Sequence, residues 1–252
     1  MTLTSLNRWK AAGLHLVLSA LIAATLVVLV LAIWYPGPYY AAMGGATLLR
    51  LLIGVDVVLG PIITLIIFDT RKPRLKWDLA AIGVLQLGAL LFGAWVMFDA
   101  RPVYTVFTGD RFEIVPANSV DAASRSRART EFAVLPLAGP RVIGAHQPTD
   151  AKERSDVMLS SMAGGPDIAH LPHLYHTYAE VATDAGRRAK PLSELARRGA
   201  AESLLVGAYL RDSGRPDDSV GYLPVRARNE DFAMVVDRKT GEVVGTLPIN
   251  PW

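Results

Sequence analysis

The chain has 252 residues, of which 51% are hydrophobic, and its mean hydropathy of +0.29 is high for a soluble protein of this length. Of its 26 basic and 23 acidic residues, seven and four lie in residues 1–100, which leaves 19 of each sign in the remainder. The later part therefore lacks the net positive charge of a nucleic-acid-binding surface. The absence of cysteine excludes disulfides, thiolate metal sites and thiol nucleophiles.

Three apolar stretches within residues 1–99 predict a transmembrane domain. They run over about 13–34, 48–68 and 79–98, and about 20 apolar residues suffice to cross the hydrocarbon core of a membrane. The first stretch exceeds the length of a signal-peptide core, and no small-residue cleavage site follows it. We therefore expect an uncleaved anchor and three spans.

Charge in the connecting segments predicts the orientation. Arg8 and Lys10 precede the first span, and four basic residues lie in the 69–78 connection, whereas the 35–47 connection has no charge. Because positively charged loops stay on the cytoplasmic side, the N-terminus should be cytoplasmic and everything after Phe98 should lie outside. In a bacterium this describes a multi-pass inner-membrane protein with a periplasmic domain. Aromatic residues of the outer connection should form an interfacial belt: Trp34, Tyr35, Tyr39 and Tyr40.

The second span, LLRLLIGVDVVLGPIITLIIF, carries three features that lipid disfavours. Arg50 lies near its outer end, from which a long side chain can reach the interface. Asp56 lies about 12 Å in from the start of the span at 1.5 Å per residue, so it should face the bundle interior, be protonated or have a partner. Pro61 removes one backbone hydrogen bond and Gly60 loosens the same turn, which predicts a kink just after Asp56.

Three roles for Asp56 remain open from the sequence. It could be hydrogen-bonded inside this bundle, with Gln86 of the third span or Ser19 or Thr25 of the first as neutral partners. It could instead be presented to a transmembrane helix of another protein. A catalytic role of the aspartyl-protease kind needs a second deep carboxylate, and Asp69 and Asp78 lie at the cytoplasmic boundary. Arg50 is no direct partner, because six residues turn a helix by about 240°.

Residues 100–252 are sufficient for a periplasmic α+β domain. A Thr-Gly-Asp turn should join strands 103–107 and 111–115, and a hairpin should form from strands 231–236 and 242–247. A capping signature at Thr149 or Asp150 predicts a helix to Met162. The segment with Arg125, Arg127 and Arg129 should be a solvated loop or a frayed helix. One or two helices are expected within 190–214, with these core residues: Leu192, Leu195, Leu204, Leu205 and Leu210.

Sequence patterns for catalysis and metal binding are weak. His170, His173 and His176 form an H-x-x-H-x-x-H run, but Pro172 interrupts any helix there, so surface or partly packed histidines are expected rather than a metal site. Motifs of serine hydrolases, zinc proteases and P-loop proteins do not occur. We therefore expect neither an enzyme nor a cofactor.

Several segments in a fixed order resemble a known family. The first span opens with KAAGLHL and closes with WYPGPYY, and the second contains LLIGVDVVLGPIITLIIF, with Gly54, Asp56, Gly60 and Pro61. KPRLKWDLAAIGVLQL, ARPVYTVFTGDRFEIV and the terminal TGEVVGTLPINPW follow. With this order and three spans, the chain resembles the TfpX/TfpZ type IV pilin accessory proteins over essentially its whole length. Residues 117–188 match least.

The resemblance implies a non-catalytic inner-membrane protein that assists the major type IV pilin. From the architecture we expect that a kinked helix bundle with a periplasmic domain contacts both the transmembrane helix and the periplasmic head of the pilin. Membrane lipids and other pilus assembly proteins are further expected partners; nucleic acid and cofactors are not. The intramembrane motif of Asp56, Gly54, Gly60, Pro61 and Arg50 is the candidate binding or structural site.

Two other classes of protein remain as alternatives. A membrane-anchored periplasmic sensor or ligand-binding protein would have a deep apolar pocket in residues 101–252. A membrane enzyme or transporter subunit would have a second buried ionisable group near Asp56.

Overall fold

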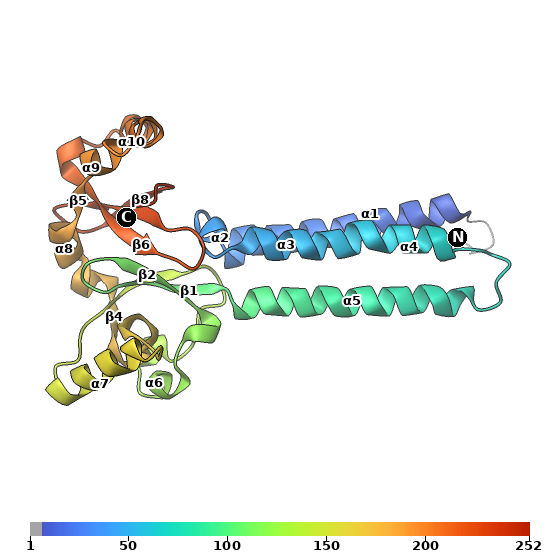
Figure 1. Cartoon of the computed structure of the whole chain (residues 1–252), viewed down its shortest axis with the longest axis horizontal. Helices are drawn as coiled ribbons and strands as arrows, with labels where there is room; N and C mark the ends of the chain where they lie inside the picture. Colours follow the sequence, from blue (N-terminus) through green and yellow to red (C-terminus); the bar gives the residue numbers. More distant parts are fainter. Residues whose placement is uncertain (1–6) are drawn as a thin grey trace. The chain divides into compact units, whose positions relative to one another are not determined.

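The computed structural model describes residues 7–252, which form two compact units. One unit holds residues 7–36 and 45–99, and the other holds residues 37–44 and 100–252 (Figure 1). The apolar pattern predicts residues 37–44 as part of the transmembrane domain. In the structure this segment packs with the second unit, for reasons given below.

The first unit consists of three long helices. The first is α1 (Arg8–Leu29) with a π-helical continuation, η2 (Val30–Trp34). The second is α3 (Gly45–Ile53), the π-helical η3 (Gly54–Leu59) and α4 (Gly60–Ile67) in one run, and the third is α5 (Leu75–Asp99). With 27, 23 and 25 residues, all three are long and apolar enough to cross a membrane. The three predicted apolar helices are confirmed; that they cross a membrane stays a prediction.

Helix packing in this unit depends on small residues. On α1 the buried positions include Ala12, Ser19 and Ala23, and on α4 they include Gly60 and Thr64. Such residues let two helix backbones approach closely. By contrast, α5 buries only Leu75 and Met97 among its residues, so it is attached along a narrow line of contacts.

Aromatic residues join the end of η2 to the end of α5. Tyr35 is only 2% exposed, and its hydroxyl donates a hydrogen bond of 2.8 Å to the carbonyl of Met97. The rings of Trp34 and Phe98 lie 5.3 Å apart. Tyr35 of the predicted interfacial belt is therefore buried within the unit, where its hydroxyl has a partner; the position of the belt at a membrane interface stays a prediction.

At the predicted kink in the second helix, the backbone changes from α-helical to π-helical hydrogen bonding. Gly60 donates its N–H to the carbonyl of Val55, five residues back, which is π-helical bonding. The π-helical segment begins at Gly54, so it includes Asp56 rather than following it. Pro61, at the second position of α4, has no N–H to restore the ordinary register.

The second unit is a curled, sheet-rich domain with short helices around it. Its strands are β1 (Pro102–Phe107), β2 (Phe112–Pro116), β3 (Arg141–Ala145), β4 (Tyr175–Thr177), β5 (Lys190–Pro191), β6 (Val220–Arg226), β7 (Phe232–Asp237) and β8 (Val243–Leu247). Its helices are α2 (Tyr39–Ala42), α6 (Ala122–Ser126), α7 (Ala151–Met162), α8 (Tyr178–Arg188), α9 (Leu192–Ala196) and α10 (Ala200–Ser213). Single 3₁₀ turns occur at 117–119, 130–132, 168–170, 172–174 and 217–219.

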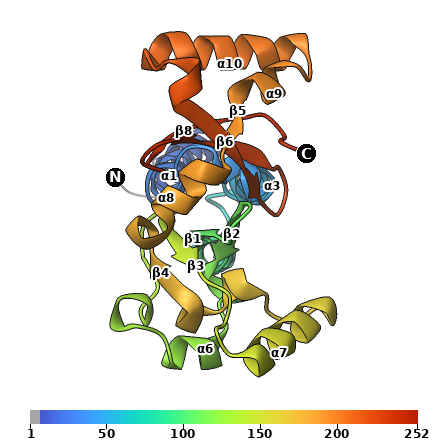
Figure 2. The same cartoon turned by 90° about the vertical axis from the view of Figure 1, so that its left-hand side faces the viewer.

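The strands form one sheet in the order β4-β3-β1-β2-β6-β7-β8, and β5 pairs with β6. Neighbours are antiparallel except for two parallel pairs, β1 with β3 and β2 with β6. The core lies in two clusters, one around β1, β3 and β4 and the other around β6, β7, β8 and α9. Figure 2 shows the corresponding arrangement, with α9 and α10 at one end of the sheet and α6 and α7 at the other.

Most elements expected in this domain are present. Strands β1 and β2 pair antiparallel, β7 and β8 form the predicted hairpin, and Asp150 caps α7 by accepting a hydrogen bond from the N–H of Glu153. Leu192 and Leu195 are buried, but Leu204 and Leu205 are 72% and 39% exposed, so their assignment to the core is wrong. Helix α10 packs instead through a different face, formed by Val206, Tyr209 and Leu210.

Residues 37–44 belong to the second unit through specific contacts. The carbonyl of Ala42 accepts a hydrogen bond of 2.9 Å from the N–H of Asn229, whose side chain donates to the carbonyl of Ala41. The hydroxyl of Tyr39 accepts a hydrogen bond of 3.0 Å from Thr105, and its ring packs edge-on against Phe232. Burial raises the pKa of Tyr39. Consequently Tyr39 packs into the sheet-rich domain.

Candidate functional site

Asp56 lies at the middle of the second long helix, which runs from Gly45 to Ile67. It is only 6% exposed, although most of the surrounding helix surface is apolar. An ionised carboxylate at the centre of a membrane helix costs about 2.5–3.5 kcal/mol on insertion scales. A residue kept there against such a cost is a candidate for binding or for specific packing.

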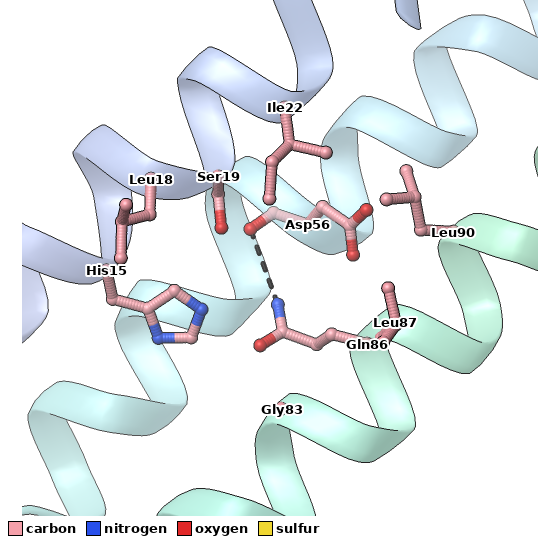
Figure 3. A pocket seen from close by; sticks show the side chains of 9 residues that line it. All are labelled: His15, Leu18, Ser19, Ile22, Asp56, Gly83, Gln86, Leu87 and Leu90. Carbon is pink, nitrogen blue, oxygen red and sulfur yellow. Dashed lines mark hydrogen bonds between the residues drawn. The ribbon is translucent and has the colours of Figure 1, made fainter.

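The local sequence leaves the backbone of Asp56 without its usual donor. Its carbonyl would bond to the N–H of Gly60 in an α-helix, but that group donates to Val55. The next residue, Pro61, has no N–H. The side-chain amide of Gln86 on α5 donates to this carbonyl at 3.4 Å, a long hydrogen bond (Figure 3).

Gly60 makes this contact possible. A side chain at this position would overlap the Gln86 amide, so any other residue would require the Gln86 side chain to move away from the carbonyl of Asp56. In contrast, nothing lies within 4 Å of a side chain built at Gly54. Of the predicted motif, Asp56, Gly60 and Pro61 are therefore brought together with Gln86, while Gly54 has no comparable contact.

Two acceptor atoms at the site lack partners within the described chain. Asp56 Oδ1 and Gln86 Oε1 are both buried, and neither has a hydrogen-bond partner among residues 7–252. Leaving a buried acceptor unsatisfied costs about 1–3 kcal/mol, and more for a charged one. Gln86, predicted as a neutral partner of Asp56, thus bonds to its backbone and not to its carboxylate.

Asp56 borders cavities on two sides of α5. The first, of about 190 Å³, lies between α1 and α5 and has these lining residues: His15, Leu18, Ser19, Ile22, Asp56, Gly83, Gln86, Leu87 and Leu90 (Figure 3). A cavity of about 210 Å³ adjoins it, also lined by His15, Leu18 and Gly83. We call these two the α1–α5 groove. Another cavity, of about 250 Å³, lies between α3 and α5, and Asp56 is its one ionisable lining residue.

His15 is a site residue that sequence reasoning missed. Its Nδ1 lies 2.6 Å from the hydroxyl oxygen of Thr64, a hydrogen bond that links α1 to α4, and its ring lines the same cavity as Asp56. A histidine within an apolar span was the available signal, since such residues face the bundle interior. Its partner could not be identified, because Thr64 lies 49 residues away.

The other predicted polar residues have separate roles. Arg50 is exposed, and its Nε donates to the carbonyl of Ala46 on its own helix, so it makes no pair with Asp56. Ser19 lines the α1–α5 groove with Asp56. Thr25 donates to the carbonyl of Leu21 one turn earlier, which excludes it as the partner of Asp56 in this structure.

The three histidines of the H-x-x-H-x-x-H run do not converge. His173 hydrogen-bonds to Ser124 and to Glu153, at 2.5 Å and 3.0 Å. His176 hydrogen-bonds to Glu180 at 3.0 Å, and its ring lies 4.3 Å from that of His146. Within residues 7–252 no group of three or more His, Asp and Glu side chains is arranged to hold a metal ion.

The arginine-rich segment is more ordered than the sequence suggested. Part of it forms α6, and Arg129 donates to Glu180 at 2.9 Å.

Beside α7 lies a cavity of about 270 Å³ whose lining includes Gln147, Arg154 and Asp167. Apolar residues form most of the rest of its lining: Pro148, Val157, Met158, Met162 and Ile168.

The fold and the site define a class: three apolar helices that indicate membrane anchoring, with a polar group buried among them, followed by a sheet-rich domain. Sequence comparison gives the family. The chain is 30% identical over 234 residues to the fimbrial assembly protein of serogroup I from Dichelobacter nodosus, covering 91% of this chain and 90% of the relative. The chain belongs to this family of fimbrial assembly proteins.

Further comparisons agree with this assignment. The serogroup E1 protein of the same organism is also 30% identical over 234 residues, with the same coverage. The protein of serogroups C1 and C2 is 38% identical over 114 residues, which cover 44% of this chain and 86% of the relative. The sequence model named fimbrial assembly protein FimB matches residues 4–44. No solved structure matches the chain. The family membership supports a role in fimbrial or pilus biogenesis.

Proposed function

We propose that this protein is a non-catalytic accessory protein of type IV pilus biogenesis, of the TfpX/TfpZ kind, which binds the major pilin and modulates pilus assembly or dynamics. The observation that carries the proposal is the similarity to fimbrial assembly proteins across 91% of the chain. The helices would lie in the bacterial inner membrane, with the N-terminus cytoplasmic and the second unit periplasmic. The basic residues of the 69–78 connection support this orientation.

The Asp56 site supports binding to a partner within the membrane. An accessory protein that handles a subunit with one apolar helix needs a recognition feature at membrane depth, where apolar contact alone gives little specificity. Asp56, with Gln86 beside it and cavities on both sides, is such a feature.

A second candidate function follows from His15. Because His15 and Asp56 line one cavity, the site has the second ionisable group expected of a membrane enzyme or transporter subunit. A proton-handling role requires titratable groups at both positions. Asparagine can form hydrogen bonds but does not titrate, so Asp56→Asn separates this function from partner binding.

The test is a deletion strain in which surface pili and total pilin are measured separately. Loss of the protein should reduce surface pili severalfold. Wild type should restore them, Asp56→Ala should not, and Asp78→Asn, at the start of α5, is the matched control for loss of a carboxylate. Unchanged pili in the deletion strain would contradict the proposed function. Full rescue by both Asp56→Ala and Asp56→Asn would show that Asp56 is not the site.

A further inference from the structure

The acceptors at the centre of the helical unit require a hydrogen-bond donor. Asp56 Oδ1 and Gln86 Oε1 are buried and lack partners within residues 7–252. Asp56 is only 6% exposed, and it borders an open cavity rather than packed side chains. Buried polar groups are almost always hydrogen-bonded, so a hydrogen-bond donor from another molecule would complete this site.

The surrounding space has the form of a site for a helix. The α1–α5 groove comprises two adjoining cavities of about 190 Å³ and 210 Å³, which extend from Leu90 on α5 to Leu79, about three turns away. Its walls are mainly aliphatic. Because α5 buries only Leu75 and Met97, a helix lying along this groove could contact α1 and α5 together.

From these observations we infer that the α1–α5 groove receives the pilin's transmembrane helix, and that a hydrogen-bond donor near the middle of that helix bonds to Asp56. The inference rests on the proposed function, since it takes the partner to be the pilin. The depth follows from the position of Asp56 at the midpoint of the helix Gly45–Ile67. The chemistry follows from the acceptors: a hydroxyl, an amide or a cationic N–H group is complementary to a carboxylate there.

Photo-crosslinking in cells that make pili tests this inference. A photoreactive side chain is placed at Leu18, which lines the groove, or at the adjacent Val17, about 100° around the helix. The two positions are 52% and 56% exposed, so they are matched in access. A third probe at Leu51 reports the cavity between α3 and α5. Adducts are identified with an antibody against the major pilin.

The expected result is a pilin adduct at Leu18 at least severalfold stronger than at Val17 or Leu51. Equal yields at Leu18 and Val17, or an adduct at Leu51 alone, would overturn the inference. If the deletion strain has a piliation defect while all three probes give no pilin adduct, the groove assignment fails and the proposed function stands.

The role of the carboxylate is tested with the probe kept at Leu18. Asp56→Leu should lower the pilin adduct severalfold, and Asp56→Asn should lower it less because one acceptor oxygen remains. Protein levels in the membrane are measured in each strain. If Asp56→Leu is present at wild-type level and the adduct is unchanged, Asp56 does not hold the helix. If Asp56→Leu does not accumulate, Asp56→Asn decides: an adduct as strong as that of the wild type would show that the Asp56 carboxylate does not hold the pilin helix.

Discussion

Glu180, in the first turn of α8, joins three segments of the sheet-rich domain. Its carboxylate accepts hydrogen bonds from Arg129 at 2.9 Å and from the N–H and hydroxyl of Thr177 at 3.0 Å and 2.9 Å, and it bonds to His176. The hydrogen bond from Arg129, followed by those from His176 and Thr177, lowers the pKa of Glu180 well below its ordinary value of 4.5. The charged form of this side chain therefore stabilises the folded state.

Stability should depend on pH through this group. Because its pKa is lower in the folded state, the stabilisation is complete above about pH 5 and is lost as pH falls below 4.5 towards the folded-state pKa. The side chain is 38% exposed, so solvent screens part of the effect. Glu180→Gln should lower the thermal midpoint of the detergent-solubilised full chain at pH 7, and by less at pH 3.

Two comparisons make this prediction specific. Glu242→Gln, in the turn between β7 and β8, is the control and should change the midpoint little at either pH. A deficit of Glu180→Gln that is as large at pH 3 as at pH 7 would contradict an electrostatic origin.

At the scale of elements, the turn between β7 and β8 is fixed by its fit against α8. Gly241 has φ of +75°, and a side chain there would overlap the backbone carbonyl of Ala182. The hydroxyl of Tyr178 donates to the carbonyl of Gly241 at 2.6 Å. The Lys-Thr-Gly turn of the predicted hairpin therefore also makes a tertiary contact, and this contact holds α8 against the sheet.

Substitution of Gly241 should separate the cost of straining its positive φ from the cost of disturbing its contact with α8. Gly214, the C-cap of α10, also has a positive φ of +63°, but nothing lies within 4 Å of a side chain built on it. Gly214→Ala should cost about 1–2 kcal/mol for backbone strain alone. Gly241→Ala should cost more, by about 1–3 kcal/mol, because overpacking is added. Thermal or chemical unfolding of the full chain measures the difference; equal losses would show that the contact with α8 is unimportant.

At the scale of the whole molecule, charge asymmetry predicts the topology. The four basic residues of the 69–78 connection should keep it cytoplasmic, and the second unit should be periplasmic. Because the chain has no cysteine, single cysteines at Arg74 and Lys239, both exposed, report the two sides without background labelling.

A membrane-impermeant maleimide should label Lys239→Cys in cells whose outer membrane alone is permeabilised. Arg74→Cys should react only after the inner membrane is disrupted. Labelling of Arg74→Cys before the inner membrane is disrupted would contradict the proposed orientation.

Much of the fold could be read from local patterns. Apolar runs located the three long helices, alternation and turn residues located β1, β2, β7 and β8, and Asp150 indicated the start of α7. The Thr177–Glu180 capping box that starts α8 was a readable signal that was missed. Each of these features depends on residues within a few positions of one another.

The sheet order could not be read in this way. The parallel pairs β1–β3 and β2–β6 join strands that are far apart in the sequence. Strand β6 also contains Gly221 and Pro224, which argue against a strand. Pro224 is tolerated because β2 pairs only with the following residues, Val225 and Arg226, on that side.

The sequence by itself determined the three apolar helices, the position of Asp56 at the middle of the second one and the disturbed turn at Gly60-Pro61, since hydropathy and backbone chemistry act locally. Only the tertiary structure decided which polar groups meet: Gln86 at the carbonyl of Asp56, and His15 at Thr64. It also decided that Tyr39 packs into the sheet-rich domain. These contacts depend on how separate helices and strands pack, and such packing cannot be predicted from the spacing of residues within one segment.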